Sequence, residues 1–408
     1  MGMLTQWFAP EQFSLPNSLS EQSVLAGDDV RVLTGFPSYP FGKIYDGYSQ
    51  ESSFRENIAG AEVYRVSSFL SHDANAKNRM RTFLSFAVAS IRRAHVLADM
   101  DVIYVYATPM TASMAAWWLR KWKGVPYVLH IQDLWPESVT SSGMLARGLI
   151  SSLVGSTLSS VLRPIYSAAS HIVVISPSMK EALVGRKVDA GKITTILNWD
   201  PSFAEEVSEG GSPSKTTRVR FVYAGNLGVM QDVETILRAA ELLRDSPEIE
   251  IHIYGSGVLE ASLQKFSTDH KLPNVIFHGR VTKAEMYSVY AASEFHLVTL
   301  KDDPLFRMTI PSKFQAAMAH GIPVVSTVQG DLEEICAEAG VGWTALPENP
   351  VSLAATMRTA AAIDVADRKA MAVRCRDLHR NKFSPDNGIA AVRRILRDVA
   401  SLNGRNVC

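Results

Sequence analysis

The stretch FVYAGNLG, from Phe221 to Gly228, decides how this chain is interpreted, because an apolar run ends there in a loop with two glycines. A helical pattern follows, with apolar residues at Val233, Ile236, Leu237, Ala240 and Leu243. A strand, a glycine-rich turn and a helix in this order are typical of a phosphate-binding unit, since backbone N–H groups and the helix N-terminus face the anion. A tight turn in which glycine merely permits positive φ gives the same pattern.

This turn lies halfway along a chain of 408 residues, which is too long for one ordinary domain. Apolar runs alternate with helical patterns on both sides of it, as in doubly wound α/β sheets. A polar stretch at 205–217, EEVSEGGSPSKTT, interrupts the alternation and is interpreted as a linker. We therefore expect two Rossmann-like domains facing each other across a cleft, one over 1–204 and one over 218–385, with a nucleotide held mainly by the second. A last helix, within 386–408, is expected to pack back toward the N-terminal domain.

Several of the expected strands are apolar throughout, as parallel strands covered on both faces are. In the first half they are Val30–Thr34, Val63–Val66, Val102–Tyr106, Tyr127–Ile131, His171–Ile175 and Ile193–Leu197. In the second half they are Arg220–Tyr223, Glu250–Tyr254, Val275–His278, Phe295–Leu300 and Val324–Ser326. The uncharged run Val102–Leu119 approaches membrane-spanning length, but its proline and hydroxyl residues favour a buried strand followed by a buried helix.

Composition describes a globular protein with large cores: 47% of the residues are hydrophobic, 20% are charged, and the formal net charge is +0. Nothing in this balance points to nucleic acid. Three widely spaced cysteines (Cys336, Cys375, Cys408) lack metal-ligand spacing and read as free thiols, and the N-terminus lacks a secretion signal, so we expect a cytoplasmic protein. The basic helical segment Arg79–Val96 is compatible with contact at the inner membrane face or with an ordinary core helix.

Two more strands of the second half end in glycine turns, and a third segment, Pro311-Ser312-Lys313, opens a helix. Because parallel strands end at one edge of a sheet, these turns favour a nucleotide site there. Ser312 is expected to N-cap the helix, and Lys313 to add positive charge at its N-terminus. The expected nucleotide-binding residues are Gly225, Asn226, Leu227, Gly228, Gln231, Gly255, Gly257, Gly279, Arg280, Val281, Arg307, Pro311, Ser312 and Lys313.

The segment HIQDLWPES, from His130 to Ser138, supplies the catalytic candidates, because ionisable side chains follow an apolar strand. Asp133 is the first choice. Glu137 is either catalytic or an ordinary first-turn carboxylate after a proline. His130 is either catalytic or a buried core histidine. Asp99 and Asp101 resemble an acidic metal pair, but they precede a strand and are expected at the opposite edge of the sheet. No other convincing acidic pair is expected in the cleft, so no metal and no resident cofactor are expected.

Together, HIQDLWPES, GNLG followed by QD, YGSG, FHGRV and PSKFQAAMAHGIPVV resemble glycosyltransferase family 4, which has the GT-B fold. TQWFAPE and TGFPSYPFGKIYDGY are similar to its bacterial surface-polysaccharide branch, which includes N-acetylfucosamine-type transferases. The resemblance implies a retaining, metal-independent transfer from a nucleotide diphosphate sugar, usually UDP-linked and here an N-acetylated hexosamine, to an acceptor hydroxyl. The resemblance further implies that 1–204 is the acceptor-binding domain and 218–385 the nucleotide-sugar-binding domain. The acceptor would be a glycan, a lipid-linked glycan or a small molecule, and Asp133 would face the donor sugar.

The chain departs from the family pattern at several positions. Asn226 and Gln231 stand where the wider family carries Arg and Lys, and Met308 and Ala316 stand where it carries two glutamates. The N-terminal glycine pair is also replaced, and the short first strand suggests a start upstream of Met1. A nucleotide-sugar epimerase on the same fold and a non-catalytic partner subunit therefore remain alternatives. A dinucleotide dehydrogenase would need a first-strand GxGxxG, which the N-terminus lacks.

Overall fold

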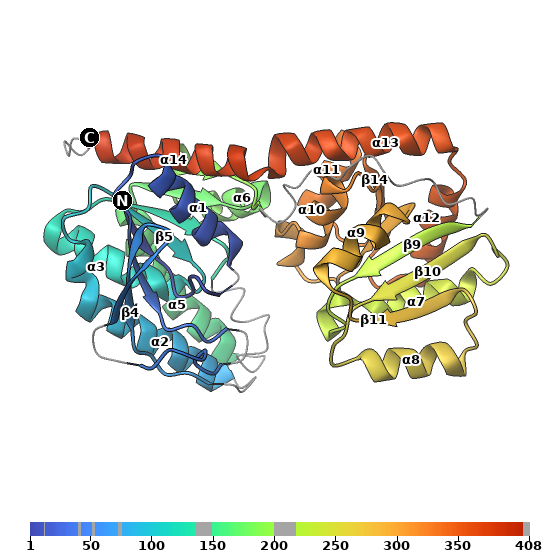
Figure 1. Cartoon of the computed structure of the whole chain (residues 1–408), viewed down its shortest axis with the longest axis horizontal. Coiled ribbons are helices and arrows are strands. Elements are labelled where there is room, and N and C mark those ends of the chain that lie inside the picture. The colour runs from blue at the N-terminus through green and yellow to red at the C-terminus, as the bar shows by residue number, and fades with distance from the viewer. Residues whose placement is uncertain are drawn as a thin grey trace. The chain divides into compact units, whose positions relative to one another are not determined.

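The computed structural model describes residues 1–11, 13–39, 42–50, 54–71, 76–135, 149–199 and 218–402. The chain forms two compact units, Met1–Pro201 with Pro385–Cys408, and Ser202–Ser384. The linker expected at 205–217 lies outside the described residues. Figure 1 shows each unit as a sheet with helices on both of its faces.

The N-terminal unit holds an eight-stranded sheet in the order β3-β4-β2-β1-β5-β6-β7-β8, parallel except for β3. The strands are β1 (Gly2–Leu4), β2 (Arg31–Gly35), β3 (Phe54–Ile58), β4 (Ala61–Val66), β5 (Ile103–Ala107), β6 (Tyr127–Ile131), β7 (His171–Val174) and β8 (Ile193–Thr195). The helices are α1 (Ser14–Leu25), α2 (Ala76–Arg93), α3 (Ser113–Lys123), α5 (Leu149–Ala168), α6 (Pro177–Gly185) and α14 (Pro385–Leu402), with short 3-10 turns at Ala94–Leu97, Met110–Ala112 and Ala190–Lys192.

The C-terminal unit holds a six-stranded parallel sheet in the order β11-β10-β9-β12-β13-β14, the doubly wound order of Rossmann-like sheets. The strands are β9 (Val219–Ala224), β10 (Ile249–Tyr254), β11 (Val275–Gly279), β12 (Phe295–Val298), β13 (Val324–Ser326) and β14 (Gly342–Thr344). The helices are α7 (Val233–Leu242), α8 (Glu260–Asp269), α9 (Lys283–Ala291), α10 (Ser312–Ala319), α11 (Asp331–Ala339), α12 (Pro350–Ala361) and α13 (Val365–Leu378), with short turns at Val229–Gln231, Phe306–Met308 and His379–Phe383. The fold class expected from the sequence is confirmed for both units.

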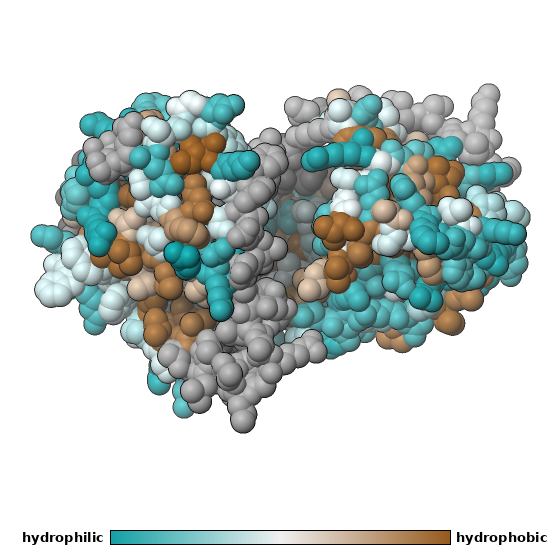
Figure 2. All heavy atoms as spheres, turned by 90° about the horizontal axis from the view of Figure 1, so that it is seen from below, coloured by the Kyte–Doolittle hydropathy of each residue, from teal (hydrophilic) through white to brown (hydrophobic). Residues whose placement is uncertain are grey.

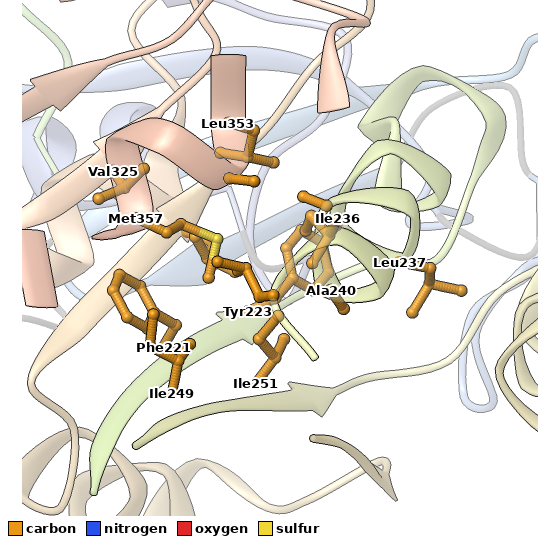
Figure 3. Close-up of a cluster of buried hydrophobic side chains, with 14 of the residues drawn as sticks. Phe221, Tyr223, Ile236, Leu237, Ala240, Ile249, Ile251, Val325, Leu353 and Met357 are labelled. Atoms are coloured by element: carbon orange, nitrogen blue, oxygen red, sulfur yellow. The ribbon is translucent and has the colours of Figure 1, made fainter. Parts of the chain in front are cut away.

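The core of the C-terminal unit explains why β9 ends where it does. Phe221 and Tyr223 point to one face of β9, where they pack with residues of β10, α7 and α12 (Figure 3). Neither side chain is exposed to solvent. Burial of this apolar face stabilises the strand by the usual area-dependent term and fixes the residue at its carboxyl end, from which the Gly225–Gly228 loop leaves the sheet.

The last helix, α14, belongs to the N-terminal unit although it ends the chain. Its apolar residues Ile389, Val392 and Leu396 join the same core cluster as residues of α1 and β1. The indole of Trp199 donates to the Ser18 hydroxyl at 3.0 Å. A Cβ at Gly388 would lie 2.2 Å from that indole, so α14 packs directly on Trp199 because this position carries no side chain.

Within the described ranges, no helix combines the length and the apolar character needed to cross a membrane. The uncharged run Val102–Leu119 forms β5, the turn Met110–Ala112 and the first part of α3, as expected from its proline and hydroxyl residues.

Candidate functional site

Three loops that follow β9, β10 and β11 bind one another at the carboxyl edge of the C-terminal sheet. The amide of Gly225 donates to the Tyr254 carbonyl at 2.9 Å, and that of Gly255 donates to the Gly279 carbonyl at 2.7 Å. The amide of Leu227 donates to the Ser256 carbonyl at 2.9 Å. These bonds bring the predicted glycine turns together, as the sheet order requires.

The glycines serve this close approach, which corrects part of the sequence interpretation. A Cβ on Gly255 would lie 1.8 Å from the Gly225 carbonyl oxygen, and one on Gly257 would lie 2.5 Å from that of Leu227. The sequence suggested that backbone N–H groups of these loops point at an anion. The amides of Gly225, Leu227 and Gly255 instead donate within the protein.

Lys313 brings a cation to the same edge from the first turn of α10. Its Nζ donates to the Tyr223 hydroxyl at 2.6 Å and lies 4.1 Å from the centre of that ring. The Tyr223 hydroxyl in turn donates to the carbonyl of Asn226 at 2.7 Å. A Cβ at Gly225 would lie 2.3 Å from Cε of Lys313, so the lysine stem crosses the loop at the glycine.

Lys313 is a partly buried cation that has no counter-ion among the described residues. Burial lowers the pKa of Lys313 to about 8, and no opposing carboxylate contributes. Among the described residues, no carboxylate oxygen lies within ion-pair distance of Nζ. An ammonium has three donors, and the Tyr223 hydroxyl uses one. The remaining capacity fits an anionic ligand, since a buried charge is stable only when it is paired.

An amide pair closes the loop beside Lys313. Nδ2 of Asn226 donates to Oε1 of Gln231 at 3.2 Å, and the Thr299 hydroxyl donates to the Gln231 carbonyl at 2.7 Å. Asp232 follows with a φ of 50° and is 7% exposed. Burial raises its pKa to about 6, and its Oδ2 has no partner among the described residues.

The other predicted nucleotide-binding residues differ in their exposure and in whether they already have a partner. Arg280 is exposed directly after β11, followed by the half-buried Val281. Arg307 is paired with Asp302 at 2.8 Å, so its charge is already met. The expectation for Ser312 is wrong: Pro311 occupies the N-cap of α10 with extended backbone, Ser312 is the first helical residue, and no side chain caps this N-terminus. The family glutamate position, Ala316, is buried in the same helix.

In the N-terminal unit, Asp133 lies two residues beyond the end of β6. Its side chain is exposed at the surface, but neighbouring groups displace part of its hydration shell. This desolvation raises the pKa of the carboxyl group, whereas the Thr108 hydroxyl and the charge of Arg79 lower it. A raised pKa makes the carboxylate a better proton acceptor. Glu137 lies outside the described residues.

His130 is a core residue in this structure, which corrects its selection as a catalytic candidate. It is 0% exposed, its Nδ1 is hydrogen-bonded to the Tyr104 hydroxyl at 2.7 Å, and its ring lies near Tyr106 and Trp199. Burial lowers its pKa to about 3. A neutral ring enclosed on every side does not reach a substrate.

Two buried charged residues, Glu11 and Arg65, were missed by sequence reasoning. Glu11 is 1% exposed and accepts from the backbone amides of Phe8, Ser38 and Tyr39 at 3.1, 2.8 and 2.7 Å. Arg65 of β4 is 1% exposed, forms an ion pair with Glu56 and donates to the Gly35 carbonyl at 2.8 Å. An arginine inside the apolar strand AEVYRV was the available signal.

In the part of the chain that the structure describes, no three His, Cys, Asp or Glu side chains lie close enough together to hold a metal ion. Asp99, part of an acidic pair before β5, binds Arg31 at 2.7 Å.

Comparison with known proteins bears on both units. Residues 17–199 match the family described as Glycosyl transferase 4-like domain, and residues 218–362 match Glycosyl transferases group 1. "Probable glycosyltransferase WbjE" of Pseudomonas aeruginosa is 30% identical over 263 residues, which cover 62% of this chain and 64% of that protein, just under two thirds of its length. "Putative colanic acid biosynthesis glycosyl transferase WcaI" of Escherichia coli strain K12 is 26% identical over 347 residues, covering 82% of this chain and 84% of that protein.

Solved structures share the fold along nearly the whole chain. Sucrose-phosphate synthase from Thermosynechococcus elongatus aligns with a TM-score of 0.72 at 17% identity, covering 98% of this chain and 99% of that one. Anabaena Alr3699/HepE, solved in complex with UDP and glucose, aligns with a TM-score of 0.62 at 16% identity, covering 97% and 98%. At these identities the likeness concerns the fold.

Proposed function

Because residues 17–199 match the family Glycosyl transferase 4-like domain and residues 218–362 match Glycosyl transferases group 1, we propose that the chain is a glycosyltransferase of polysaccharide biosynthesis that uses a nucleotide diphosphate sugar. The observation that carries this proposal is the half-buried ammonium of Lys313 at the carboxyl edge of β9, which meets a tyrosine hydroxyl instead of a carboxylate. Nucleotides bind at this edge of doubly wound sheets.

UDP is the first nucleotide to consider, since Alr3699/HepE has been solved with UDP and with UDP-glucose. In this chain the diphosphate would be met by Lys313, the N-terminus of α10 and the side-chain amides of Asn226 and Gln231. Negative charge grows on the leaving diphosphate during transfer, and fixed cations and dipoles stabilise it. The resemblance to the N-acetylfucosamine-type branch makes UDP-N-acetylhexosamines the donors to test before others.

We propose retention of anomeric configuration by front-face attack, with the acceptor hydroxyl entering on the side from which the diphosphate leaves. A β-phosphate oxygen would take the proton of the acceptor. Asp133, with its raised pKa, would orient the acceptor or stabilise positive charge on the sugar. The mechanism assigns no step to a metal, because Lys313 supplies the positive charge.

The acceptor is proposed to be a membrane-proximal glycan. Helix α2 buries Phe83 and Phe86 and exposes Leu84 and Val88, each to 48%, on the face that also carries the exposed Arg81 and Arg92. Figure 2 shows apolar residues interspersed with hydrophilic ones on the visible face of the N-terminal unit. A basic helix with apolar side chains fits the surface of an anionic membrane. Sedimentation with anionic vesicles, and its loss in Leu84→Glu/Val88→Glu, tests this contact.

The donor assignment is tested by isothermal calorimetry of the full chain with UDP, ADP, GDP and a panel of UDP-sugars. We expect binding of UDP and of at least one UDP-N-acetylhexosamine, and absence of binding by every nucleotide would contradict the proposal. Product analysis with donor alone separates an epimerase from a transferase, because an epimerase converts its donor without an acceptor. A partner subunit would fold normally and bind none of the nucleotides.

The role of Asp133 is tested by Asp133→Asn, which keeps shape and removes charge. Transfer should fall by about 10² to 10⁴-fold, the usual size of a proton-transfer or charge effect, while UDP affinity stays unchanged. Equal loss of transfer and UDP affinity would instead place Asp133 in a structural role.

A further inference from the structure

The Tyr223 hydroxyl links the loop that follows β9 to the Lys313 ammonium of α10. We propose that Tyr223 is a positioning residue that holds the Lys313 ammonium at the diphosphate subsite and acts through it without touching the substrate. This inference rests on the proposed function, because it assigns to Lys313 the diphosphate of a nucleotide sugar. The two residues are 90 positions apart in the chain and meet at 2.6 Å.

The direction of both hydrogen bonds follows from the groups involved. A backbone carbonyl cannot donate, so the Tyr223 hydroxyl gives its single proton to the Asn226 carbonyl, 2.7 Å away. An ammonium cannot accept, so Lys313 donates to the hydroxyl oxygen. One hydroxyl thus orients the loop that follows β9 and the cation that crosses it.

The ring gives this hydroxyl a fixed position. Tyr223 is 0% exposed, and its side chain packs among residues of β10, α7 and α12 (Figure 3). The Lys313 ammonium also lies 4.1 Å from the centre of the ring, where the negative face of the π-system attracts a cation. A flexible lysine stem loses side-chain entropy when it is held, so an ammonium that is already placed binds an anion with a smaller entropic cost.

Lys313 is the group that titrates in a useful pH range. The titratable groups that face it are Tyr223 of β9 and His296 of β12. Burial raises the pKa of Tyr223, and burial lowers that of His296 to about 3, so both are neutral between pH 6.5 and 9.5. Asp232, on the following turn, has a pKa raised to about 6 and is mostly ionised across this range. Lys313, with its pKa lowered to about 8, loses its charge within it.

The pH dependence separates positioning from a structural role. A hydrogen bond to the charged form of a group favours that form, so removal of the Tyr223 hydroxyl lowers the pKa of Lys313 further. The affinity for UDP depends on the charged lysine and declines as pH rises. In Tyr223→Phe this decline should therefore begin at a lower pH than in the wild type.

The experiment is calorimetric titration of the full chain with UDP from pH 6.5 to 9.5. At pH 7 we expect Tyr223→Phe to bind UDP about tenfold more weakly, the size of one hydrogen bond to a charged group. The midpoint of the alkaline decline should also move down. In a Lys313→Met background the same substitution should have no further effect, because Tyr223 acts through the lysine.

Tyr127→Phe is the matched control, because its buried hydroxyl donates to the Ile165 carbonyl in the other unit. It should lower stability without moving the UDP affinity or its pH midpoint. If Tyr223→Phe fails to fold, 3-fluorotyrosine at position 223 weakens the hydroxyl as an acceptor and should give the same downward shift. An unchanged midpoint in a folded variant overturns the inference alone, whereas failure of the wild type to bind UDP overturns the proposed function with it.

Discussion

Arg65 of the N-terminal unit and Lys313 of the C-terminal unit are two cations withdrawn from water, and their surroundings differ. The Arg65 guanidinium forms an ion pair with Glu56 and donates to the carbonyls of Gly35 and Ala9. The Lys313 ammonium donates to the Tyr223 hydroxyl and has, in the described part of the chain, no carboxylate at ion-pair distance.

This difference supports a structural role for Arg65 and is the basis for our proposal that Lys313 binds an anionic ligand. The hydrogen bonds of Arg65 join β4 to β3, β2 and the loop after β1, so its charge is neutralised and its donors are satisfied within the protein. Burial without a counter-charge is unfavourable, and the pKa of Lys313 is lowered accordingly. Local instability of this kind is typical of binding sites, where the ligand supplies the missing charge.

The largest expected effect is on folding, from Arg65→Met. This change removes the counter-ion of Glu56 and leaves the carbonyl of Gly35 without its donor. Breaking a buried pair by removing one partner costs about 3–5 kcal/mol, and we expect a loss of that size in the free energy of unfolding of the N-terminal unit, measured in urea. UDP affinity of the folded protein should not change.

Arg55→Met is the control for this experiment, because Arg55 is an exposed strand arginine whose ion pair with Glu62 lies at the surface. Surface pairs contribute up to about 1 kcal/mol, so this variant should stay close to the wild type. Equal losses in both variants would remove the distinction between Arg65 and an ordinary surface arginine.

Lys313→Met should have the opposite effects to Arg65→Met, weakening UDP binding without lowering the free energy of unfolding. Loss of a charged hydrogen-bond donor to the diphosphate is expected to weaken UDP binding by about 10 to 100-fold, while the free energy of unfolding stays the same or rises because a desolvated charge is removed. Calorimetry and urea unfolding of the same preparation give both numbers. Lys265→Met, at an exposed pair with Asp269 on α8, should alter neither. Destabilisation by Lys313→Met with intact UDP binding would make the lysine a structural cation like Arg65.

Much of the fold follows from local sequence signals. The run FVYA before two glycines predicts β9 and its turn, since the apolar residues specify a buried strand and the glycines end it. Strands β3 and β14 were missed for the converse reason. Residues of β3 alternate between half-buried and exposed, and β14 is three half-buried residues long, so neither has an apolar run.

The sequence predicted that the glycine turns after β9, β10 and β11 meet, because they follow neighbouring strands of one parallel sheet. The side-chain contacts at this edge were not predicted. Tyr223 and Lys313 are 90 residues apart, and no periodicity in a single sequence relates them. The N-cap prediction for Ser312 failed because Pro311, with a φ of −62° and a ψ of 143°, is itself an extended cap and moves the start of the helix by one residue. His130 was ambiguous because a strand pattern does not tell which polar side chain is enclosed.

The smallest of these effects tests whether the path of the lysine stem matters as well as its charge. Gly225 has a φ of 152°, and an added Cβ would lie 2.3 Å from Cε of Lys313. Gly225→Ala should therefore displace the Lys313 ammonium from Tyr223 without removing its positive charge. Because the stem can rotate, we expect a loss of UDP affinity of about threefold to tenfold, smaller than the loss on removing a charged hydrogen bond altogether.

Backbone strain alone has to be separated from this displacement. Gly124 also has positive φ, at 71°, but a Cβ there meets nothing within 4 Å. Gly124→Ala should lower stability by about 1–3 kcal/mol through strain and leave UDP binding unchanged. If Gly225→Ala likewise loses stability but keeps its affinity for UDP, the exact position of the Lys313 ammonium does not limit binding. Lys313 would then differ from Arg65 only in lacking a counter-ion.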